Sequence, residues 1–275
     1  MIRLKKVTEK VILKIAKIIL KKHIGKSNYQ NVFEYFYSLS LAGMNIGTGA
    51  QTDTSGEKNA LLYIENKLQH IEKLCVFDVG ANIGFYTILL NDIFKERAKI
   101  YSFEPSKKTF TALSENTVNL KNRNIFNFGF GDAITSIKLF YDKEQSGLAS
   151  IYERRLDHFD IKMKLSEIIE IKTIDSFCLQ NDISQIHFLK IDVEGHELKV
   201  LNGASDLIKN NKIDFIQFEF GGCNIDSRTY FQDFFYLLND GFYIYRILKD
   251  GLCKIENYKE MYETFVTTNF LAERK

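Results

Sequence analysis

The sequence has few cysteines, a single proline and no long uncharged apolar run. Its four cysteines are scattered along 275 residues, with no CxxC pair and no nearby histidine to complete a metal cluster. We therefore predict that they are reduced packing residues. Apolar residues still make up 45% of the chain, which is enough to bury the core of one α/β domain.

The most apolar stretch near the N-terminus, residues 11–20, is interrupted by Lys14 and Lys17. It fits neither a signal-peptide core nor a membrane span, so we expect a cytoplasmic protein. On a helix, Lys10, Lys14, Lys17 and Lys21 form one stripe opposite a face of isoleucines. Such a basic amphipathic helix suits docking on its own domain, a homodimer contact, or peripheral contact with anionic lipid at the inner membrane face.

Basic residues outnumber acidic ones near the N-terminus, and acidic residues outnumber basic ones in the rest of the chain. Residues 1–26 carry nine Lys or Arg and one acid, a net charge of +8, whereas the whole chain carries +2. Residues 27–275 therefore have a net charge of −6. Because nucleic-acid binding requires clustered basic residues on one face, we predict no nucleic-acid partner.

From residue 75 onward, short apolar runs alternate with longer stretches of helical spacing. The apolar runs predict strands over residues 75–79, 99–103, 125–130, 186–191 and 215–220. Helical periods are found over residues 86–94, 109–120 and 197–209. This alternation predicts a Rossmann-like α/β fold with a mostly parallel sheet and helices on both faces. Two β-rich runs, at 241–248 and 264–272, predict a C-terminal antiparallel hairpin.

The residues before this region contain turn formers and a helix signal. Residues 43–56 are rich in glycine and threonine and predict a loop or lid, and Thr54 or Ser55 followed by Glu57 predicts the start of a helix. We therefore expect residues 1–50 to form a helical extension with a lid segment, and residues 51–275 to form the α/β domain.

The strand at 75–79 runs into a glycine turn and then a helix. Ligands of open α/β sheets bind at such a junction. The glycines Gly80 and Gly84 have GxxxG spacing, whereas a dinucleotide site uses GxGxxG to hold a pyrophosphate. Asp78 stands two residues before the first glycine, where a carboxylate repels phosphate but attracts an ammonium group. This pattern favours S-adenosylmethionine as the cofactor, with its cationic methionyl part near Asp78.

Two further acidic positions fit the same cofactor. Glu104 ends the second strand, where a carboxylate can accept hydrogen bonds from two ribose hydroxyls, and Pro105 stops the strand directly after it. Gly131 and Asp132 follow the third strand, where Asp132 is a candidate acceptor for the adenine amino group, although Gly-Asp is also a common turn. The candidate cofactor-binding residues are Asp78, Gly80, Ala81, Asn82, Gly84, Tyr86, Thr87, Glu104, Pro105, Gly131, Asp132 and Asp192.

Ionisable residues gather at the end of the fourth strand. Strand alternation places Lys190, Asp192 and Glu194 on one face, and His196 stands at the start of the next helix. Methyl transfer to a neutral hydroxyl needs an aligned acceptor and a proton acceptor. The catalytic candidates are His196, Asp192, Glu194 and Glu219, and we favour His196 or Asp192 as the general base. Asp192 and Glu194 could alternatively bind a divalent metal, but one short pair of acids is weak support, and we assign no metal.

Four motifs together resemble the FkbM-type methyltransferases. They are Asp78-Val-Gly-Ala-Asn-x-Gly, Glu104-Pro, Thr173-Ile-Asp175 and Leu189-Lys-Ile-Asp-Val-Glu-Gly-His-Glu, and the resemblance covers roughly residues 45–272. It implies a class I methyltransferase fold with a seven-stranded sheet. It also implies an S-adenosylmethionine-dependent enzyme that O-methylates a sugar, glycan or natural-product precursor.

Two other functions remain open at this point. An NAD-dependent oxidoreductase shares the strand, turn and helix and the acidic second-strand residue, but the missing GxGxxG and the presence of Asp78 disfavour it. A cofactor-binding scaffold without catalysis is the other alternative, and the acidic residues between Asp192 and Glu197 argue against it.

Overall fold

A computed structural model describes residue 14 and residues 17–47 and 55–275 of the chain. The chain divides into two compact units, Met1–Met44 and Asn45–Lys275. The predicted domain boundary between residues 50 and 51 lies outside the described residues, as does most of the predicted lid segment. The same holds for most of the predicted basic helix, of which only residues 14 and 17–21 are described.

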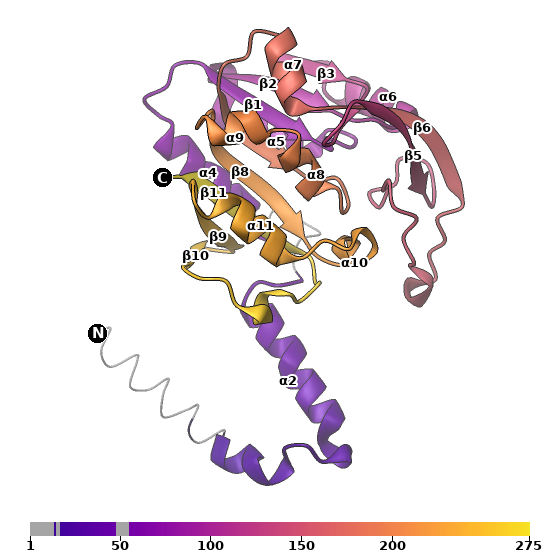
Figure 1. Cartoon of the computed structure of the whole chain (residues 1–275), viewed down its shortest axis with the longest axis vertical. Helices are drawn as coiled ribbons and strands as arrows, with labels where there is room; N and C mark the ends of the chain where they lie inside the picture. The colour runs from indigo at the N-terminus through magenta and orange to yellow at the C-terminus, as the bar shows by residue number, and fades with distance from the viewer. Residues whose placement is uncertain (1–13, 15–16, 48–54) are drawn as a thin grey trace. The chain divides into compact units, whose positions relative to one another are not determined.

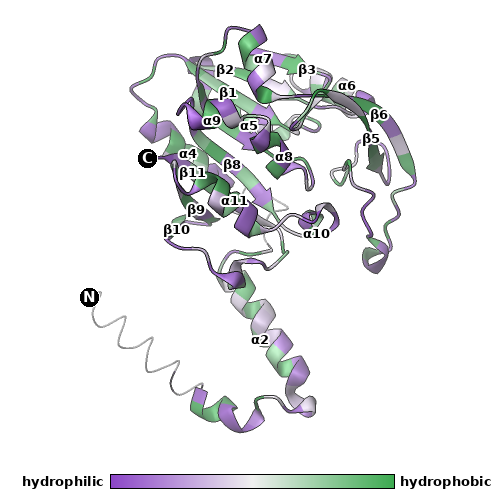
Figure 2. Ribbon diagram, viewed as in Figure 1, coloured by the Kyte–Doolittle hydropathy of each residue, from purple (hydrophilic) through white to green (hydrophobic). Residues whose placement is uncertain are grey.

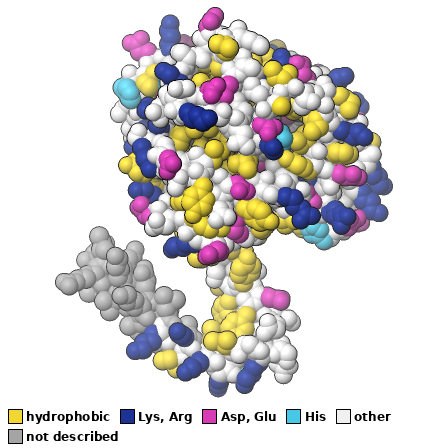
Figure 3. Space-filling view, in the orientation of Figure 1, with side chains coloured by type: hydrophobic (Ala, Val, Ile, Leu, Met, Phe, Trp, Pro, Cys, Tyr) yellow, Lys and Arg dark blue, Asp and Glu magenta, His cyan; other side chains and the backbone are white. Residues whose placement is uncertain are grey.

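The described part of the N-terminal unit is helical. It comprises η1 (Lys21–His23), η2 (Ser27–Tyr29) and α2 (Gln30–Gly43). Figure 3 shows Lys and Arg side chains gathered beside hydrophobic ones on this unit. Its exposed apolar side chains on α2 are Val32, Tyr35, Phe36, Tyr37 and Leu39. Contact with lipid or with a second copy through this unit stays a prediction. Among the described residues, no helix is long and apolar enough to cross a membrane.

The larger unit is built on an eight-stranded sheet in the order β10-β9-β11-β8-β7-β1-β2-β3 (Figure 1). The parallel strands are β1 (Leu74–Val79), β2 (Ala98–Phe103), β3 (Arg123–Phe126), β7 (Ile186–Ile191) and β8 (Ile213–Phe220). The chain moves outward from β1 through β2 to β3, then returns to β7 on the other side of β1. This reversal confirms the predicted Rossmann-like α/β fold and places a topological switch point between β1 and β7.

The C-terminal edge of the sheet is antiparallel. Strand β11 (Thr268–Arg274) pairs antiparallel with both β8 and β9 (Phe242–Leu248), as the two predicted β-rich runs require. An additional strand, β10 (Gly251–Ile255), folds back on β9 after a two-residue turn and buries Ile255. The sheet therefore has eight strands, where the resemblance led us to expect seven.

Helices cover both faces of this sheet. One face carries α4 (Glu57–Lys67) and α5 (Phe85–Phe94). The other carries α7 (Ile174–Gln180), α8 (Glu197–Asn202), α9 (Ser205–Lys209) and α11 (Phe231–Leu238). Because side chains alternate along a strand, Phe77 and Val76 of β1 enter opposite cores. In Figure 2 the strands of the main sheet are largely hydrophobic, whereas α11 carries both hydrophobic and hydrophilic residues.

The predicted helix over residues 197–209 is interrupted. It forms α8 and α9, which are separated at Gly203 and Ala204. A Cβ at Gly203 would lie 2.0 Å from the carbonyl oxygen of Gly131, so the chain passes too close to Gly131 for any side chain. The remaining short elements are α6 (Lys107–Asn116), α10 (Cys223–Ser227), η3 (Lys95–Arg97), η4 (Asp157–Phe159) and η5 (Glu260–Tyr262).

A second, three-stranded sheet was not predicted from the sequence. Its order is β4-β6-β5, with β4 (Gly129–Phe130), β5 (Thr135–Tyr141) and β6 (Leu165–Lys172). Leu139, Ile169 and Ile171 form its small core. The predicted strand over residues 125–130 is thus divided between β3 and β4, and the chain between β5 and β6 forms a long loop over residues 142–164.

Candidate active site

A cavity of about 950 Å³ lies at the carboxyl ends of β1, β7 and β8, beside the switch point. This is the place where ligands of open α/β sheets bind, and the volume is in the range of small-molecule sites. Its walls come from the turn after β1, from the small sheet, and from the chain that follows β7 and β8. Ten of the sequence-predicted site residues line it, namely Gly80, Ala81, Asn82, Tyr86, Glu104, Pro105, Asp192, Glu194, His196 and Glu219.

The turn after β1 and the end of β2 carry the candidate cofactor-binding residues Gly80, Ala81, Asn82, Glu104 and Pro105, and we call this part of the cavity the cofactor end after that prediction. The backbone N–H groups of Gly80 and Ala81 both donate to the Phe103 carbonyl at 3.0 Å. Gly80 has φ +81°, and a Cβ there would lie 1.8 Å from the carbonyl oxygen of Asp192. Glycine is therefore required at this position, and the turn is held against both β2 and the chain after β7.

Glu104 is fixed in the wall of the cofactor end. One carboxylate oxygen accepts from the N–H of Asn82 at 3.0 Å, and the other accepts from the N–H of Ser106 at 2.9 Å. Burial raises the pKa of Glu104 to about 7, although these two hydrogen bonds lower it. Each oxygen keeps a lone pair that a ligand hydroxyl can use. Beside it, the side-chain oxygen of Asn82 is buried without a hydrogen-bond partner among the described residues.

The small sheet supplies an apolar wall next to Glu104. Leu139 of β5 and Ile169 and Ile171 of β6 line the cavity together with Phe130 of β4. Our reading of the sequence missed this wall. A short signal was present, because apolar residues alternate with polar ones over residues 169–172 and 136–139.

Three predicted cofactor residues lie behind the wall and not on it. Asp78 has no exposed surface, accepts a hydrogen bond from the Thr87 hydroxyl at 2.7 Å, and lies 3.8 Å from the Lys190 ammonium. Burial raises its pKa, and the charge of Lys190 opposes that shift. Gly84 is the N-cap residue of α5, with φ +95°, and it packs on Leu113. The Oδ1 atom of Asp78 has no hydrogen bond among the described residues, and the contact of Asp78 with a cofactor ammonium group stays a prediction.

Gly131 and Asp132 also lie outside the cavity lining. Asp132 forms an ion pair with Lys199 at 2.7 Å, and this hydrogen bond lowers its pKa. Gly131 packs against the imidazole of His196, where a Cβ would lie 2.8 Å from Nε2. The predicted contact of Asp132 with an adenine amino group has no support in this arrangement.

Another part of the cavity contains the catalytic candidates Asp192, Glu194 and Glu219, and we call it the acceptor end after that prediction. Its lining also includes Glu57, Lys190 and Arg154. The ammonium of Lys190 lies 3.0 Å from the Asp192 carboxylate and 4.4 Å from the centre of the Tyr86 ring. Burial lowers the pKa of Lys190, but Asp192, Asp78 and Glu57 together raise it above its usual value. Lys190 is therefore charged, and its positive charge stabilises several carboxylates.

Strand β7 ends at Ile191, so Asp192 and Glu194 do not share a strand face as expected. Both lie in the loop before α8, where Glu194 adopts φ +52°. Glu197 fixes this loop, because its buried carboxylate accepts from the N–H groups of Val193 and Gly195 at 3.1 Å each. Burial raises the pKa of Glu197 to about 7.

Glu57 is a site residue that our sequence interpretation treated only as a helix start. Its carboxylate accepts from the side-chain amide of Gln217 and from the Ser55 hydroxyl, both at 2.8 Å. Gln217 in turn accepts a hydrogen bond from Tyr86 at 2.8 Å. Burial is the main reason that the pKa of Glu57 is raised. The helix signal was correct, since α4 begins at Glu57.

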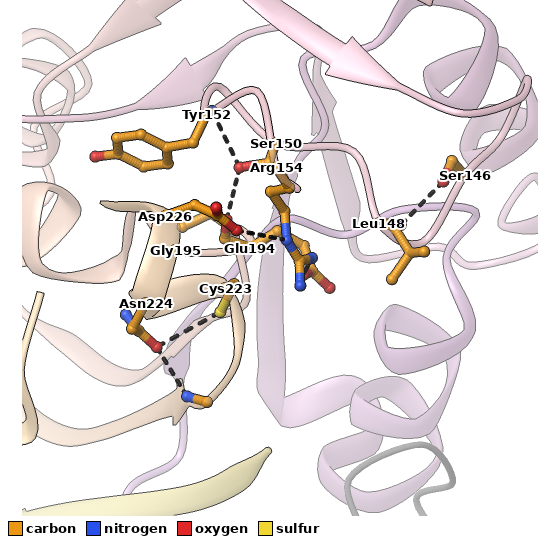
Figure 4. A network of polar contacts seen from close by, with 12 residues as sticks. Ser146, Leu148, Ser150, Tyr152, Arg154, Glu194, Gly195, Cys223, Asn224 and Asp226 are labelled. Carbon is orange, nitrogen blue, oxygen red and sulfur yellow. Dashed lines mark hydrogen bonds and ion pairs between the residues drawn. The ribbon is translucent and has the colours of Figure 1, made fainter. Parts of the chain in front are cut away.

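The long loop between β5 and β6 contributes Arg154, which no sequence motif indicated. Figure 4 shows Arg154 reaching the Glu194 carboxylate, with Asp226 also close to its guanidinium. Its Nε lies 3.8 Å from the Asp226 carboxylate, and the Ser150 hydroxyl donates to the Glu194 carbonyl at 2.7 Å. Burial and the charge of Asp192 raise the pKa of Glu194 to about 8. The loop is thus attached to the chain after β7.

His196 is the N-cap residue of α8, at the helix start where it was predicted, and it lines the cavity. Its Nδ1 lies 3.1 Å from the hydroxyl of Tyr152, also from the long loop. Burial lowers the pKa of His196 to about 4, so the imidazole is neutral near neutral pH.

Glu219 is the least partnered carboxyl group of the site. It lies near the end of β8, and its carboxyl group has no hydrogen bond or ion pair within the described residues. Burial, followed by the charges of Asp192 and Glu194, raises its pKa well above the usual value. Within the same described part of the chain, no group of three His, Cys, Asp or Glu residues could hold a metal ion.

The fold and the cavity define a Rossmann-like α/β protein whose ligand site lies at the carboxyl ends of the central strands. Residues 78–245, more than half of the chain, match the FkbM methyltransferase domain. The chain therefore belongs to the FkbM methyltransferase family.

Two curated relatives have names that agree with this family. The chain is 25% identical over 172 residues to the hexuronic acid methyltransferase AglP of Haloferax volcanii, which covers 62% of this chain and 65% of that protein. It is 23% identical over 146 residues to methyltransferase 1 of Beauveria bassiana, an alignment that covers 48% of this chain and 58% of that protein. The chain thus spans less than two thirds of the length of either relative. Among solved structures, a precorrin-6y C5,15-methyltransferase from Geobacter metallireducens aligns with a TM-score of 0.42 at 9% identity, over 79% of this chain and 87% of that chain.

Proposed function

We propose that the protein transfers a methyl group from S-adenosylmethionine to a hydroxyl group of a sugar or sugar-like acceptor. The observation that carries this proposal is the position of Glu104 in the cavity wall beside the Gly80 turn. Membership of the FkbM methyltransferase family supports the reaction type. The relative that is named a hexuronic acid methyltransferase supports a sugar as the acceptor.

The residues of the cofactor end fit S-adenosylmethionine. Glu104 would accept hydrogen bonds from the ribose hydroxyls, and the unpartnered side-chain oxygen of Asn82 would accept from a cofactor donor. Phe130 and Ile169 would flank the adenine with apolar surface. When bound, this cofactor supplies an electrophilic methyl carbon attached to a sulfonium.

The acceptor end fits a ligand with several hydroxyl groups. The carboxyl groups of Asp192, Glu194 and Glu219 and the side chain of Asn269 offer hydrogen-bond acceptors around one space. Phe265 adds an aromatic ring to the same wall, and the negative face of such a ring suits the C–H face of a pyranose. Hydroxyl-rich acceptors are therefore preferred over flat apolar ones.

The acceptor hydroxyl must lose its proton as its oxygen forms the new bond to carbon. Asp192 is placed for this role, because its carbonyl touches Gly80 and its N–H donates to Val79 at 2.9 Å, so it lies where the two ends of the cavity meet. Lys190 holds its carboxylate at 3.0 Å. His196 is neutral and was the other favoured base, but its ring packs on Gly131 and Tyr152. We therefore assign Asp192 as the general base that accepts the proton of the acceptor hydroxyl.

A mass-shift experiment tests the proposed function. The full chain is incubated with S-adenosylmethionine and a panel of methyl glycosides, and products are examined for the added mass of one methylene unit. The proposal expects a methylated sugar formed in equal amount with S-adenosylhomocysteine. Formation of S-adenosylhomocysteine with a methylated protein or nucleic acid, and no methylated sugar, would reject the proposed acceptor.

A further inference from the structure

The acceptor end holds more carboxyl groups than cations. Glu57, Asp192, Glu194 and Glu219 line it, whereas the cationic side chains in its lining are Lys190 and Arg154. Taking carboxylates out of water is costly unless cations or hydrogen-bond donors compensate them. The partners of each group therefore indicate what kind of ligand the space can accept.

Both cations are already engaged. The Lys190 ammonium lies 3.0 Å from the Asp192 carboxylate and 3.8 Å from the Asp78 carboxylate. The Arg154 guanidinium contacts Glu194 and lies 3.8 Å from Asp226, and its side chain is only 8% exposed (Figure 4). An anionic acceptor group would find no unengaged cation in the described lining, and it would face several carboxylates.

One carboxyl group, in contrast, has no hydrogen-bond or ion-pair partner among the residues that the structure describes. Glu57 receives hydrogen bonds from Gln217 and Ser55, and Glu194 is paired with Arg154. Glu219 has no such bond or ion pair within the described residues, although its side chain lines the cavity. Its neighbour across the sheet is Asn269 on β11, which also lines the cavity and carries no charge.

We propose that the acceptor is an amino sugar whose ammonium group is held by the carboxylate of Glu219, and that sugars carrying a carboxylate or phosphate are excluded. This inference rests on the proposed sugar methylation, and the methyl group still goes to a hydroxyl of the sugar. Burial and the neighbouring carboxylates raise the pKa of Glu219 in the empty site, and an ammonium group placed beside it favours its ionised form. The acceptor class thus differs from the hexuronic acid in the name of the AglP relative.

The ammonium group beside Glu219 has a second source, namely the methionyl part of the cofactor. The two sources predict different effects of one substitution. If Glu219 holds the acceptor, Glu219→Gln leaves the affinity for S-adenosylmethionine unchanged and weakens only the amino sugar. If Glu219 holds the cofactor, the same substitution weakens S-adenosylmethionine and leaves the ranking of acceptors intact, which would overturn the proposal.

The test measures acceptor binding to the full chain saturated with S-adenosylhomocysteine, by calorimetry near neutral pH, so that it does not depend on turnover. Four methyl glycosides with the same ring are compared: the amino sugar, its N-acetyl derivative, the neutral hexose and the uronic acid. The series is repeated on gluco, galacto and manno rings. We expect the amino sugar to bind about tenfold more tightly than the neutral hexose, as one charge-assisted hydrogen bond predicts, and the uronic acid to bind most weakly.

Glu219→Gln should bring the amino sugar to within about twofold of the neutral hexose, since it removes the charge that distinguishes them. The exposed Glu72 provides the matched control, and Glu72→Gln should keep the original ranking. Tighter binding of the uronic acid, or no preference for the amino sugar on any ring, refutes the inference in the unaltered protein. The sugar-methylation proposal fails separately, if none of the sugars is methylated while another acceptor is.

Discussion

The carboxyl groups at the two ends of the cavity differ in how completely the protein supplies their hydrogen-bond and ion-pair partners. At the cofactor end, Glu104 receives two backbone hydrogen bonds, and Asp78 is sealed behind the wall with Thr87 and Lys190. At the acceptor end, Glu219 has no partner in the described part of the chain, and Arg154 comes from a long loop that carries no recognisable motif. The carboxyl groups at the proposed cofactor site thus have protein partners, whereas one carboxyl group at the proposed acceptor site is left for a ligand.

The largest expected effect comes from crowding the cofactor end with Gly80→Ala. The new methyl group would meet the Asp192 carbonyl oxygen, and φ +81° is unfavourable for alanine. We expect a loss of about 3 kcal/mol or more in the free energy of unfolding, together with loss of cofactor binding. Urea unfolding and calorimetry measure both quantities.

The control for Gly80→Ala is Gly251→Ala, where a Cβ meets nothing within 4 Å. It should change stability and cofactor affinity little. If the two substitutions had equal effects on stability and cofactor affinity, the turn after β1 would not be sterically constrained at Gly80.

A large kinetic effect should come from the junction of the two ends. Asp192→Asn removes the proposed proton acceptor, so kcat should fall by roughly 10² to 10⁴ while the affinity for S-adenosylmethionine changes less than threefold. His196→Ala should cost less, because this neutral imidazole packs on Gly131 and Tyr152. Steady-state kinetics with the methylated sugar as the readout decide between them. If His196→Ala lowers kcat more than Asp192→Asn, the base is His196.

Glu104→Gln should change the affinity for the cofactor without changing the preference among acceptor sugars. It replaces a charge-assisted acceptor by a neutral one, so S-adenosylmethionine should bind roughly 10- to 100-fold more weakly, corresponding to about 1.5–3 kcal/mol. The ranking of acceptor sugars should stay as in the unaltered protein. A changed ranking with unchanged cofactor affinity would place Glu104 at the wrong end.

The smallest expected effect is the pH dependence of cofactor binding. Because burial raises the pKa of Glu104 to about 7, this group is mostly protonated at pH 6 in the free protein. Ribose hydroxyls donate better to the ionised form, so affinity should rise by up to about tenfold between pH 6 and pH 8 and then level off. Calorimetry across this range measures the slope, and Glu104→Gln should flatten it. A slope that survives the substitution belongs to another group.

The sequence was most informative where backbone geometry and chemistry coincide. The strand over residues 186–191 was predicted to the residue, and Gly80 and Glu104 were placed at one edge of the sheet because parallel strands end there. The acceptor end was less predictable. Arg154 reaches Glu194 across 40 positions of sequence, and Glu57 becomes a site residue only through Gln217, 160 positions away.

Two candidate cofactor residues have protein partners that their motifs did not indicate. Asp78 was assigned to the cofactor because a carboxylate at the strand end attracts an ammonium group, and Lys190 on the neighbouring strand lies 3.8 Å from it. Asp132 was a candidate acceptor for the adenine amino group, and Lys199 of α8 forms an ion pair with it. Each lysine comes from a distant segment of the chain, so residue spacing within one motif does not reveal it.

The most direct test of the account is calorimetric titration of the full chain with S-adenosylmethionine, S-adenosylhomocysteine and NAD. The cofactor end predicts binding of both sulfur compounds and none of NAD, since the Gly80 turn lacks the glycine spacing that holds a pyrophosphate. Tight binding of NAD with no binding of S-adenosylmethionine would contradict it.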